Sequence, residues 1–164
     1  MDIHLEFERK WRLRELPDLP WTRTLRIRQG YISQGSRWVR IRETLLDDGG
    51  ATYILCRKVR KGAMPVEMET PVSADAFALL WTLCSRNSLE KVRREWLDPL
   101  GRLWEFDEYA GTLQGLITLE LELPSLDVPV TLPDAVSAVL IAELTGDPAW
   151  SNRALASTGL PSNY

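Results

Sequence analysis

Apolar and polar residues alternate with a period of two along much of the chain, and residues 4–13 show this most clearly. One side of this stretch is mainly apolar and carries Leu5, Phe7, Arg9, Trp11 and Leu13. The other side is charged and carries Glu6, Glu8, Lys10 and Arg12. Period two is typical of a β-strand, whose successive side chains point to opposite faces. We therefore expect a strand with one face on a core and the other in water or in a polar cavity.

The same alternation predicts further strands over residues 22–32, 37–45, 52–60, 64–72, 89–97, 102–109 and 116–123. Asp47-Asp48-Gly49-Gly50 is a strong hairpin signal between two of them. Helical spacing of apolar residues predicts helices over 74–85, with Ser73 as its N-cap, over 135–143 and over 148–157. The chain has no internal repeat or second domain boundary, so residues 1–164 are expected to form one α+β, mainly β domain.

Charges recur as pairs two residues apart, so both members of a pair point the same way. Acidic pairs are Glu6/Glu8, Glu67/Glu69, Glu105/Asp107 and Glu120/Glu122. Basic pairs are Lys10/Arg12, Arg40/Arg42, Lys58/Arg60 and Lys91/Arg93. About eight strands can close into a barrel without free edges. If the charged faces point outward, the fold is a sandwich with solvated strands; if they point inward, it is a polar tunnel covered by helices. Spacing leaves both open.

Composition excludes several classes of function. The net charge is −3 with a pI near 5.3, so the overall positive charge typical of nucleic-acid binding is absent. No apolar run approaches the roughly 20 residues of a membrane span, and the start does not resemble a signal peptide, so we expect a cytoplasmic protein. Cys56 and Cys84 lack metal-type spacing, and His4 is the only histidine, which argues against a zinc site or a catalytic triad.

Several motifs carry a resemblance to a known family. Glu6-Phe7-Glu8-Arg9-Lys10 resembles the E-x-E-x-K signature of the CYTH family, the triphosphate tunnel metalloenzymes. The similarity continues in order through Gln29-Gly30-Tyr31, Val39-Arg40-Ile41-Arg42, Lys58, Lys91-Val92-Arg93, Trp104-Glu105-Phe106-Asp107 and Glu120-Leu121-Glu122-Leu123. It ends in Thr145-Gly146-Asp147, Asn152 and Leu155-Ala156, which resemble the tail of small bacterial members.

The resemblance implies a closed eight-stranded antiparallel β-barrel, with flanking helices, that binds a triphosphate and a divalent metal inside. Mg²⁺ or Mn²⁺ is expected, because both prefer hard oxygen ligands. The metal-binding set is Glu6, Glu8, Glu67, Glu69, Glu105, Asp107, Glu120 and Glu122, and the triphosphate-binding set is Lys10, Arg40, Arg42, Lys58, Lys91 and Arg93. Catalysis is assigned to Lys10, Glu6, Glu8 and Lys91. Family members are often dimers, so a homodimer is an alternative to the monomer.

The residue types fit phosphoanhydride hydrolysis, which depends on positioning and charge neutralisation more than on covalent chemistry. Arginine offers two parallel donors to phosphate and lysine a mobile point charge. The hypothesis is that a metal-bound or carboxylate-held water attacks the terminal phosphorus. Two positions remain open: Pro65 stands where the family has an arginine, and Cys56 either lines the tunnel or is a small buried side chain.

The expected substrate is inorganic tripolyphosphate, cleaved to pyrophosphate and phosphate, because the chain is compact and shows no extra segment for a base or a thiamine ring. One alternative is a class IV-type adenylyl cyclase, and another is a hydrolase of an organic triphosphate such as ATP or thiamine triphosphate. A non-catalytic triphosphate or polyphosphate-binding module is the alternative from a different class. Fold-level analogy does not decide among them.

Overall fold

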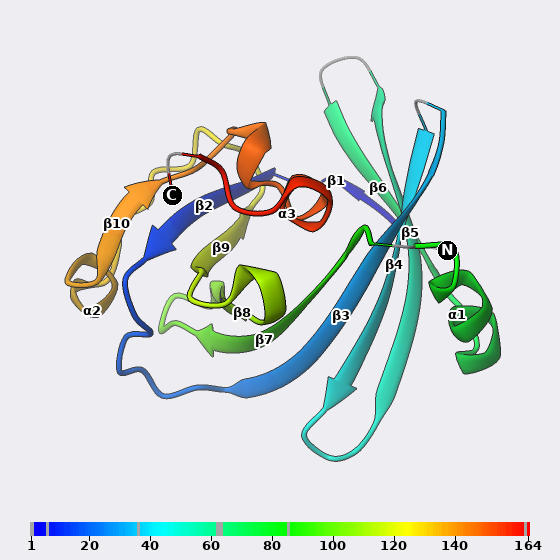
Figure 1. The fold of residues 1–164 in the computed structure, drawn as a ribbon. Helices are drawn as coiled ribbons and strands as arrows, with labels where there is room; N and C mark the ends of the chain where they lie inside the picture. Colours follow the sequence, from blue (N-terminus) through cyan, green and yellow to red (C-terminus); the bar gives the residue numbers. More distant parts are fainter. Residues whose placement is uncertain (1, 6, 36, 62–63, 85, 163) are drawn as a thin grey trace.

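The computed structural model describes residues 2–5, 7–35, 37–61, 64–84, 86–162 and 164, with Glu6 outside the described set. Its strands are β1 (Asp2–Leu5), β2 (Phe7–Leu13), β3 (Arg23–Gln34), β4 (Arg37–Leu46), β5 (Ala51–Lys61), β6 (Met64–Pro71), β7 (Ser88–Leu97), β8 (Leu103–Tyr109), β9 (Ile117–Leu123) and β10 (Leu140–Glu143). Its helices are α1 (Ala74–Trp81), α2 (Asp134–Ser137) and α3 (Asn152–Thr158), with single 3₁₀ turns at 111–113 and 148–150. Figure 1 shows the strands curving around a concave side.

The described strands form one antiparallel sheet in the order β1-β6-β5-β4-β3-β7-β8-β9-β2-β10. This confirms a mainly β, antiparallel fold with flanking helices. Within the described part of the chain, the sheet contains ten strands rather than eight and is not closed by hydrogen bonds. The predicted first strand has different partners on either side of Glu6: β1 pairs with β6, and β2 pairs with β9.

The predicted helix over 135–143 is wrong in its second half. Only Asp134–Ser137 is helical, and Leu140–Glu143 forms β10. Leu140 pairs with Leu13 and Glu143 with Trp11, so β10 covers the backbone edge of β2. Pairing with an otherwise open strand edge outweighs the local helical pattern, because unpaired edge groups favour a partner strand.

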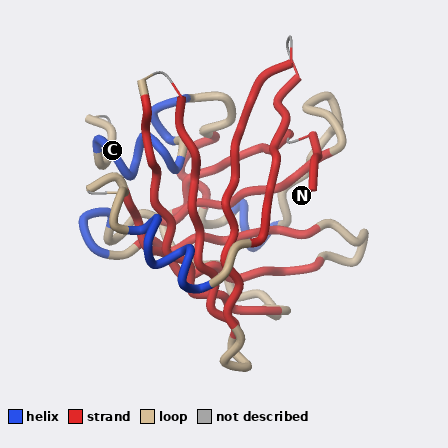
Figure 2. The backbone as a smooth tube through the Cα atoms, turned by 90° about the vertical axis from the view of Figure 1, so that its right-hand side faces the viewer, coloured by secondary structure: helices blue, strands red, loops and turns tan. Residues whose placement is uncertain are grey.

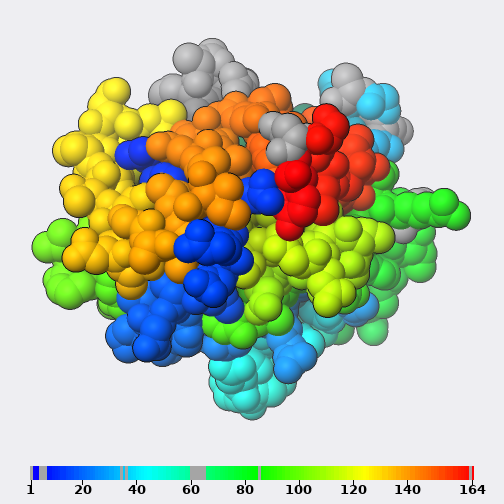
Figure 3. All heavy atoms as spheres, turned by 60° about the vertical axis from the view of Figure 1, so that its left-hand side comes forward, coloured from blue at the N-terminus to red at the C-terminus, as the bar shows by residue number. Residues whose placement is uncertain are grey.

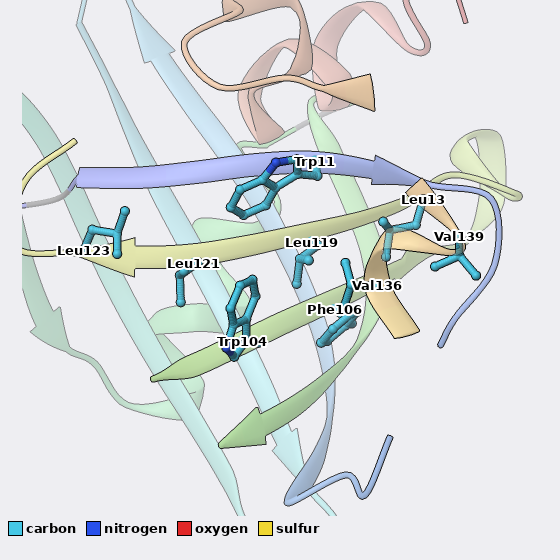
Figure 4. Close-up of a cluster of buried hydrophobic side chains, with 9 residues drawn as sticks. All are labelled: Trp11, Leu13, Trp104, Phe106, Leu119, Leu121, Leu123, Val136 and Val139. Carbon is cyan, nitrogen blue, oxygen red and sulfur yellow. The ribbon is translucent and has the colours of Figure 1, made fainter. Parts of the chain in front are cut away.

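The outer face of β2, β8 and β9 carries an apolar cluster. Figure 4 shows its nine side chains: Trp11, Leu13, Trp104, Phe106, Leu119, Leu121, Leu123, Val136 and Val139. The last two come from α2 and the turn after it, and they cover the sheet. These apolar side chains alternate with charged ones along each strand. Because the apolar ones pack on the outer face, the charged ones of the same strands point towards the concave side.

Helix α1 covers the outer face of β4 and β5, as the view from that side shows (Figure 2). Phe77 packs between Tyr53 and Trp81, with ring centroids 5.1 and 5.4 Å away. Gly30 of β3 lies beneath the C-terminal end of α1, next to Trp81 and Cys84. A Cβ added there would come within 2.5 Å of Cys84 Sγ. The glycine of the Gln29-Gly30-Tyr31 motif therefore permits close packing beneath α1.

The C-terminal segment covers part of the concave side. Leu155 and Trp150 share an apolar cluster with Leu113 and Leu116, and α3 contacts β3 and β7. Figure 3 shows the C-terminal residues (red) beside the chain near residue 110 (yellow-green). Arg12, which shares the charged face of β2 with Lys10, has its guanidinium carbon 4.0 Å from the Tyr164 ring centroid. Its charge is therefore held against the C-terminal end of the chain.

Candidate active site

A cavity of about 560 Å³ opens on the concave side of the sheet. Each of the strands β2 to β9 contributes to its lining, and the start of α3 adds Ser151, Asn152 and Arg153. The charged lining residues are Glu8, Glu67, Glu69, Glu105, Glu120 and Glu122, with Arg40, Arg42, Lys58, Arg93 and Arg153. The inward orientation of the paired charges, which spacing had left open, is thus established for these positions.

Arg93 joins three carboxylates on one wall of the cavity. Its guanidinium lies 2.5 Å from Glu105, 2.6 Å from Asp107 and 2.7 Å from Glu120. These contacts follow from the register, because Arg93 pairs with Asp107 across β7 and β8, and Glu105 pairs with Glu120 across β8 and β9. Burial raises the pKa of Glu105, and the Arg93 charge opposes that shift.

Two buried lysines lie behind this wall. Lys10 donates to Glu120 over 2.8 Å, and Lys91 donates to Asp107 over 2.5 Å. Burial lowers the pKa of Lys91 to about 8, with Arg93 adding to the shift and Asp107 opposing it. For Lys10, burial is outweighed by Glu120, so its pKa is raised. Neither lysine lines the cavity itself; each acts on the lining through its carboxylate partner.

Arg40 organises a second ion cluster on β4, β5 and β6. It donates to Glu67 over 2.8 Å and to Glu69 over 2.9 Å, and Lys58 lies 3.6 Å from Glu67. Burial opposes ionisation of Glu67, but Arg40 and Lys58 outweigh it and lower its pKa to about 2. The Sγ atom of Cys56 donates to Glu67 over 2.8 Å, and burial raises the thiol pKa to about 12. Cys56 is therefore a buried, protonated neighbour of the cluster.

Arg42 differs from its neighbour Arg40. Its Nε donates to Gln29 Oε1 over 3.3 Å, and Gln29 in turn donates to the Tyr31 hydroxyl over 2.9 Å. Burial lowers the pKa of Arg42, with the nearby positive charges of Arg40 and Arg93 adding to the shift. Within the described residues no carboxylate forms a salt bridge with Arg42. An anion in the cavity would therefore relieve the repulsion among these three guanidinium groups.

Glu8 and Glu122 lie directly opposite each other across β2 and β9. Like charges at opposed strand positions repel, and a divalent cation between them would reverse the sign of that interaction. Their carboxylates, with Glu120 in the same wall, are hard oxygen donors that suit Mg²⁺ or Mn²⁺. Among the described residues, ligand atoms of Cys56, Glu67 and Glu69 also lie within 4.8 Å of one another, and Arg40 donates to both carboxylates. Glu8 and Glu122 thus offer further carboxylate oxygens on another wall of the same cavity.

The structure brings together most of the residues selected from the sequence. Ten of them line the cavity: Glu8, Arg40, Arg42, Lys58, Glu67, Glu69, Arg93, Glu105, Glu120 and Glu122. Lys10, Lys91 and Asp107 are buried behind the lining. Glu6 and the side chain of Pro65 lie outside the described set.

Sequence reasoning did not assign Tyr31, Trp38, Asn152 or Arg153 to the cavity, although all four line it. For Trp38 a signal was present, because it precedes Arg40 and Arg42 at period two and must share their face. Arg153 had no such signal, since its position depends on how α3 packs against the sheet.

Known proteins resemble this chain over most of its length. An inorganic triphosphatase of Nitrosomonas europaea is 30% identical over 156 residues, which cover 92% of this chain and 96% of that protein. The chain belongs to the inorganic triphosphatase family. A second family member, from Acetivibrio thermocellus, is 33% identical over 126 residues and 76% of each chain. No protein-family model matches the chain.

The crystal structure of the inorganic triphosphatase NE1496 matches the fold with a TM-score of 0.67 and 29% identity, over 92% of this chain and 93% of that one. The family predicted from the motifs, CYTH-like and close to small bacterial triphosphatases, is thereby confirmed. Across the described residues, no helix is long and apolar enough to span a membrane. The cytoplasmic location and the homodimer stay predictions.

Proposed function

We propose that this protein hydrolyses inorganic tripolyphosphate to pyrophosphate and phosphate with the help of Mg²⁺ or Mn²⁺. The observation that carries the proposal is the cavity itself, in which guanidinium and ammonium groups face carboxylates around about 560 Å³. Relatives that cover nearly the whole chain are named inorganic triphosphatases, which supports the same reaction. In this proposal β1 and β2 together complete the wall of the tunnel.

The triphosphate is bound by Arg40, Arg42, Lys58 and Arg93, whose side chains line the cavity. Arg40 and Arg93 exchange carboxylate contacts for phosphate oxygens when the substrate enters, and their planar donors match phosphate geometry. Lys10 and Lys91 support this exchange from behind, because each holds a carboxylate that Arg93 also contacts. The cavity thus presents preorganised positive charge where negative charge develops in the transition state.

Glu8 and Glu122 would hold the metal, with Glu120 beside them on β9; Glu6, which the sequence also selects as a ligand, lies outside the described residues. When bound, Mg²⁺ or Mn²⁺ supplies Lewis-acid polarisation and charge neutralisation at phosphate oxygens. Glu67 and Asp107 are assigned a different task from the one expected for them. Each accepts bonds from an arginine at 2.6–2.8 Å and is itself buried, so each orients the cation that grips the substrate.

The test is phosphate release from tripolyphosphate, ATP and thiamine triphosphate, each with Mg²⁺ and with Mn²⁺. Tripolyphosphate should be turned over fastest, and Glu8→Gln should abolish the metal-dependent rate. Glu90→Gln is the matched control, because Glu90 is exposed on β7 and does not line the cavity.

Other products would identify the alternatives. Cyclic AMP and pyrophosphate from ATP would indicate a cyclase, and faster turnover of ATP or thiamine triphosphate would indicate an organic substrate. Tight binding of tripolyphosphate without phosphate release at saturating metal would indicate a binding module.

A further inference from the structure

Arg153 and Trp38 form a stacked pair at the cavity. The guanidinium carbon of Arg153 lies 5.1 Å from the centroid of the Trp38 ring, and both residues line the cavity. The indole also approaches Tyr31 edge-on, with ring centroids 5.6 Å apart and an angle of 64°. The pair therefore joins α3 to the inner face of β4, outside the strand motifs on which the family resemblance rests.

The start of α3 is fixed in place, so the position of Arg153 is defined. Ser151 caps the helix by accepting from the Ala154 amide over 3.2 Å. Asn152 Oδ1 accepts from the buried Tyr109 hydroxyl over 2.6 Å. Leu155, two residues after Arg153, is 2% exposed in the core. Arg153 thus projects from an anchored turn and not from a loose terminus.

Arg153 differs electrostatically from three of the four cations that the strands contribute to the cavity, and it is similar to the fourth, Arg42, which also forms no salt bridge among the described residues. Arg40, Lys58 and Arg93 already form salt bridges with carboxylates. Among the described residues, no carboxylate lies within salt-bridge distance of Arg153, and its guanidinium lies over the Trp38 ring. Arg153 can therefore bind an anion without first giving up an ion pair, and stacking on the indole orients its donors.

The same contact occupies the surface that an organic group would use. An exposed indole face in a phosphate-binding cavity is a place where a nucleobase can stack. Here the Arg153 guanidinium already lies over that ring. Tripolyphosphate ends in a free phosphate at both ends, whereas ATP has a free phosphate at one end only.

We propose that Arg153, oriented by Trp38, is a specificity-determining residue that selects a triphosphate with two free ends over a nucleoside triphosphate. This inference rests on the proposed function. Arg153 binds the end of tripolyphosphate that carries the nucleoside in ATP, and it keeps the indole face closed to the base. Trp38 is the positioning residue for Arg153.

The experiment compares kcat/KM for tripolyphosphate and for ATP in wild type and variants. Arg153→Ala should lower the tripolyphosphate value by about tenfold, the loss expected for one charged hydrogen-bonding group, while the ATP value holds or rises. Arg153→Lys should retain part of the preference, and Arg57→Ala should leave it unchanged, because Arg57 is exposed and does not line the cavity. Trp38→Phe should keep the preference and Trp38→Leu should lose it.

An unchanged ratio of the two kcat/KM values in Arg153→Ala, or an equal fall for both substrates, would overturn the inference while leaving the proposed function intact. If wild type turns over neither compound, the proposed function fails, and isothermal titration with tripolyphosphate and ATP then decides the inference. In that measurement Arg153→Ala must weaken the binding of tripolyphosphate about tenfold more than it weakens the binding of ATP. Equal affinity changes for both ligands would refute it.

Discussion

Lys10 donates to Glu120 directly across β2 and β9, over 2.8 Å, and both side chains are only 6% exposed. Glu120 also accepts from Arg93 over 2.7 Å. Two buried cations therefore depend on one buried carboxylate. Such a group cannot be removed without leaving charge in a poorly solvated place.

Glu120→Gln should destabilise the fold by about 3 kcal/mol, because the buried Lys10 and Arg93 lose an anionic partner. Its exposed neighbour on the same strand, Glu122, provides the comparison. Glu122→Gln should change stability by less than about 0.5 kcal/mol, as expected for a surface substitution. Urea unfolding measures both. Equal losses in the two variants would contradict the role assigned to the Lys10–Glu120 pair.

Asp98 should make stability depend on pH in a defined window. It is 6% exposed and accepts from Trp104 Nε1 over 3.0 Å and from the amides of Leu100 and Arg102. Burial opposes its ionisation, but these hydrogen bonds outweigh burial and lower its pKa to about 2. A carboxyl whose folded pKa is depressed stabilises the fold above its unfolded pKa, and that contribution is lost as pH falls towards the folded value.

Asp98→Asn should therefore cost about 2 kcal/mol at pH 7, and its difference from wild type should shrink between about pH 4 and pH 2. Chemical denaturation of both proteins across that range gives the difference directly, so other titrating groups cancel. A difference that stays constant down to pH 2 would show that the pKa of Asp98 is not depressed.

Gly30→Ala should destabilise the packing of α1 by about 1–3 kcal/mol, because the new methyl group overpacks a filled site. Its Cβ would lie 2.5 Å from Cys84 Sγ and 2.8 Å from Cys84 Cβ. Ser33→Ala, an exposed position on the same strand, is the control. Thermal unfolding measures the stability of both variants. A Gly30→Ala protein as stable as wild type would mean that Cys84 can shift to accommodate the methyl group.

Divalent metal should stabilise the folded protein by binding to Glu8 and Glu122. At a free Mg²⁺ or Mn²⁺ concentration of a hundredfold above Kd, mass action gives about 2.7 kcal/mol. The double variant Glu8→Gln, Glu122→Gln should lose this gain, whereas Glu90→Gln should keep it. Denaturation with and without metal measures the effect, and equal stabilisation of the double variant would place the metal elsewhere.

Period-two alternation predicted which residues share a face, because strand geometry alone determines it. Trp104 and Phe106 are in the outer core, while Glu105 and Asp107 face the opposite side, as the pattern indicated. The same rule identified most of the cavity residues. It could not show that Lys10 and Lys91 lie behind the lining, because that depends on which carboxylate stands across the strand.

Features that depend on contacts distant in sequence were missed. The run from Ala135 onward has helical spacing, yet Leu140–Glu143 is recruited to the edge of β2. Arg12 and Tyr164 are far apart in the sequence, yet the Arg12 guanidinium carbon lies 4.0 Å from the centroid of the Tyr164 ring. Arg153 entered the cavity through the packing of α3. In each case tertiary pairing decided the outcome, and a single local pattern carries no information about it.

The β2–β9 pairing also determines when Glu8 and Glu122 can come together during folding. Lys10 and Glu120 are 110 residues apart in the sequence. Closing so long a loop costs conformational entropy before the contacts between the two strands can offset it. The strands β3 to β6 pair in chain order through short connections and can assemble as they emerge. Glu8 can pair with Glu122 only after β9 has been synthesised. The part of the chain that carries Arg40, Arg42 and Lys58 can therefore assemble before β9 brings Glu122 opposite Glu8.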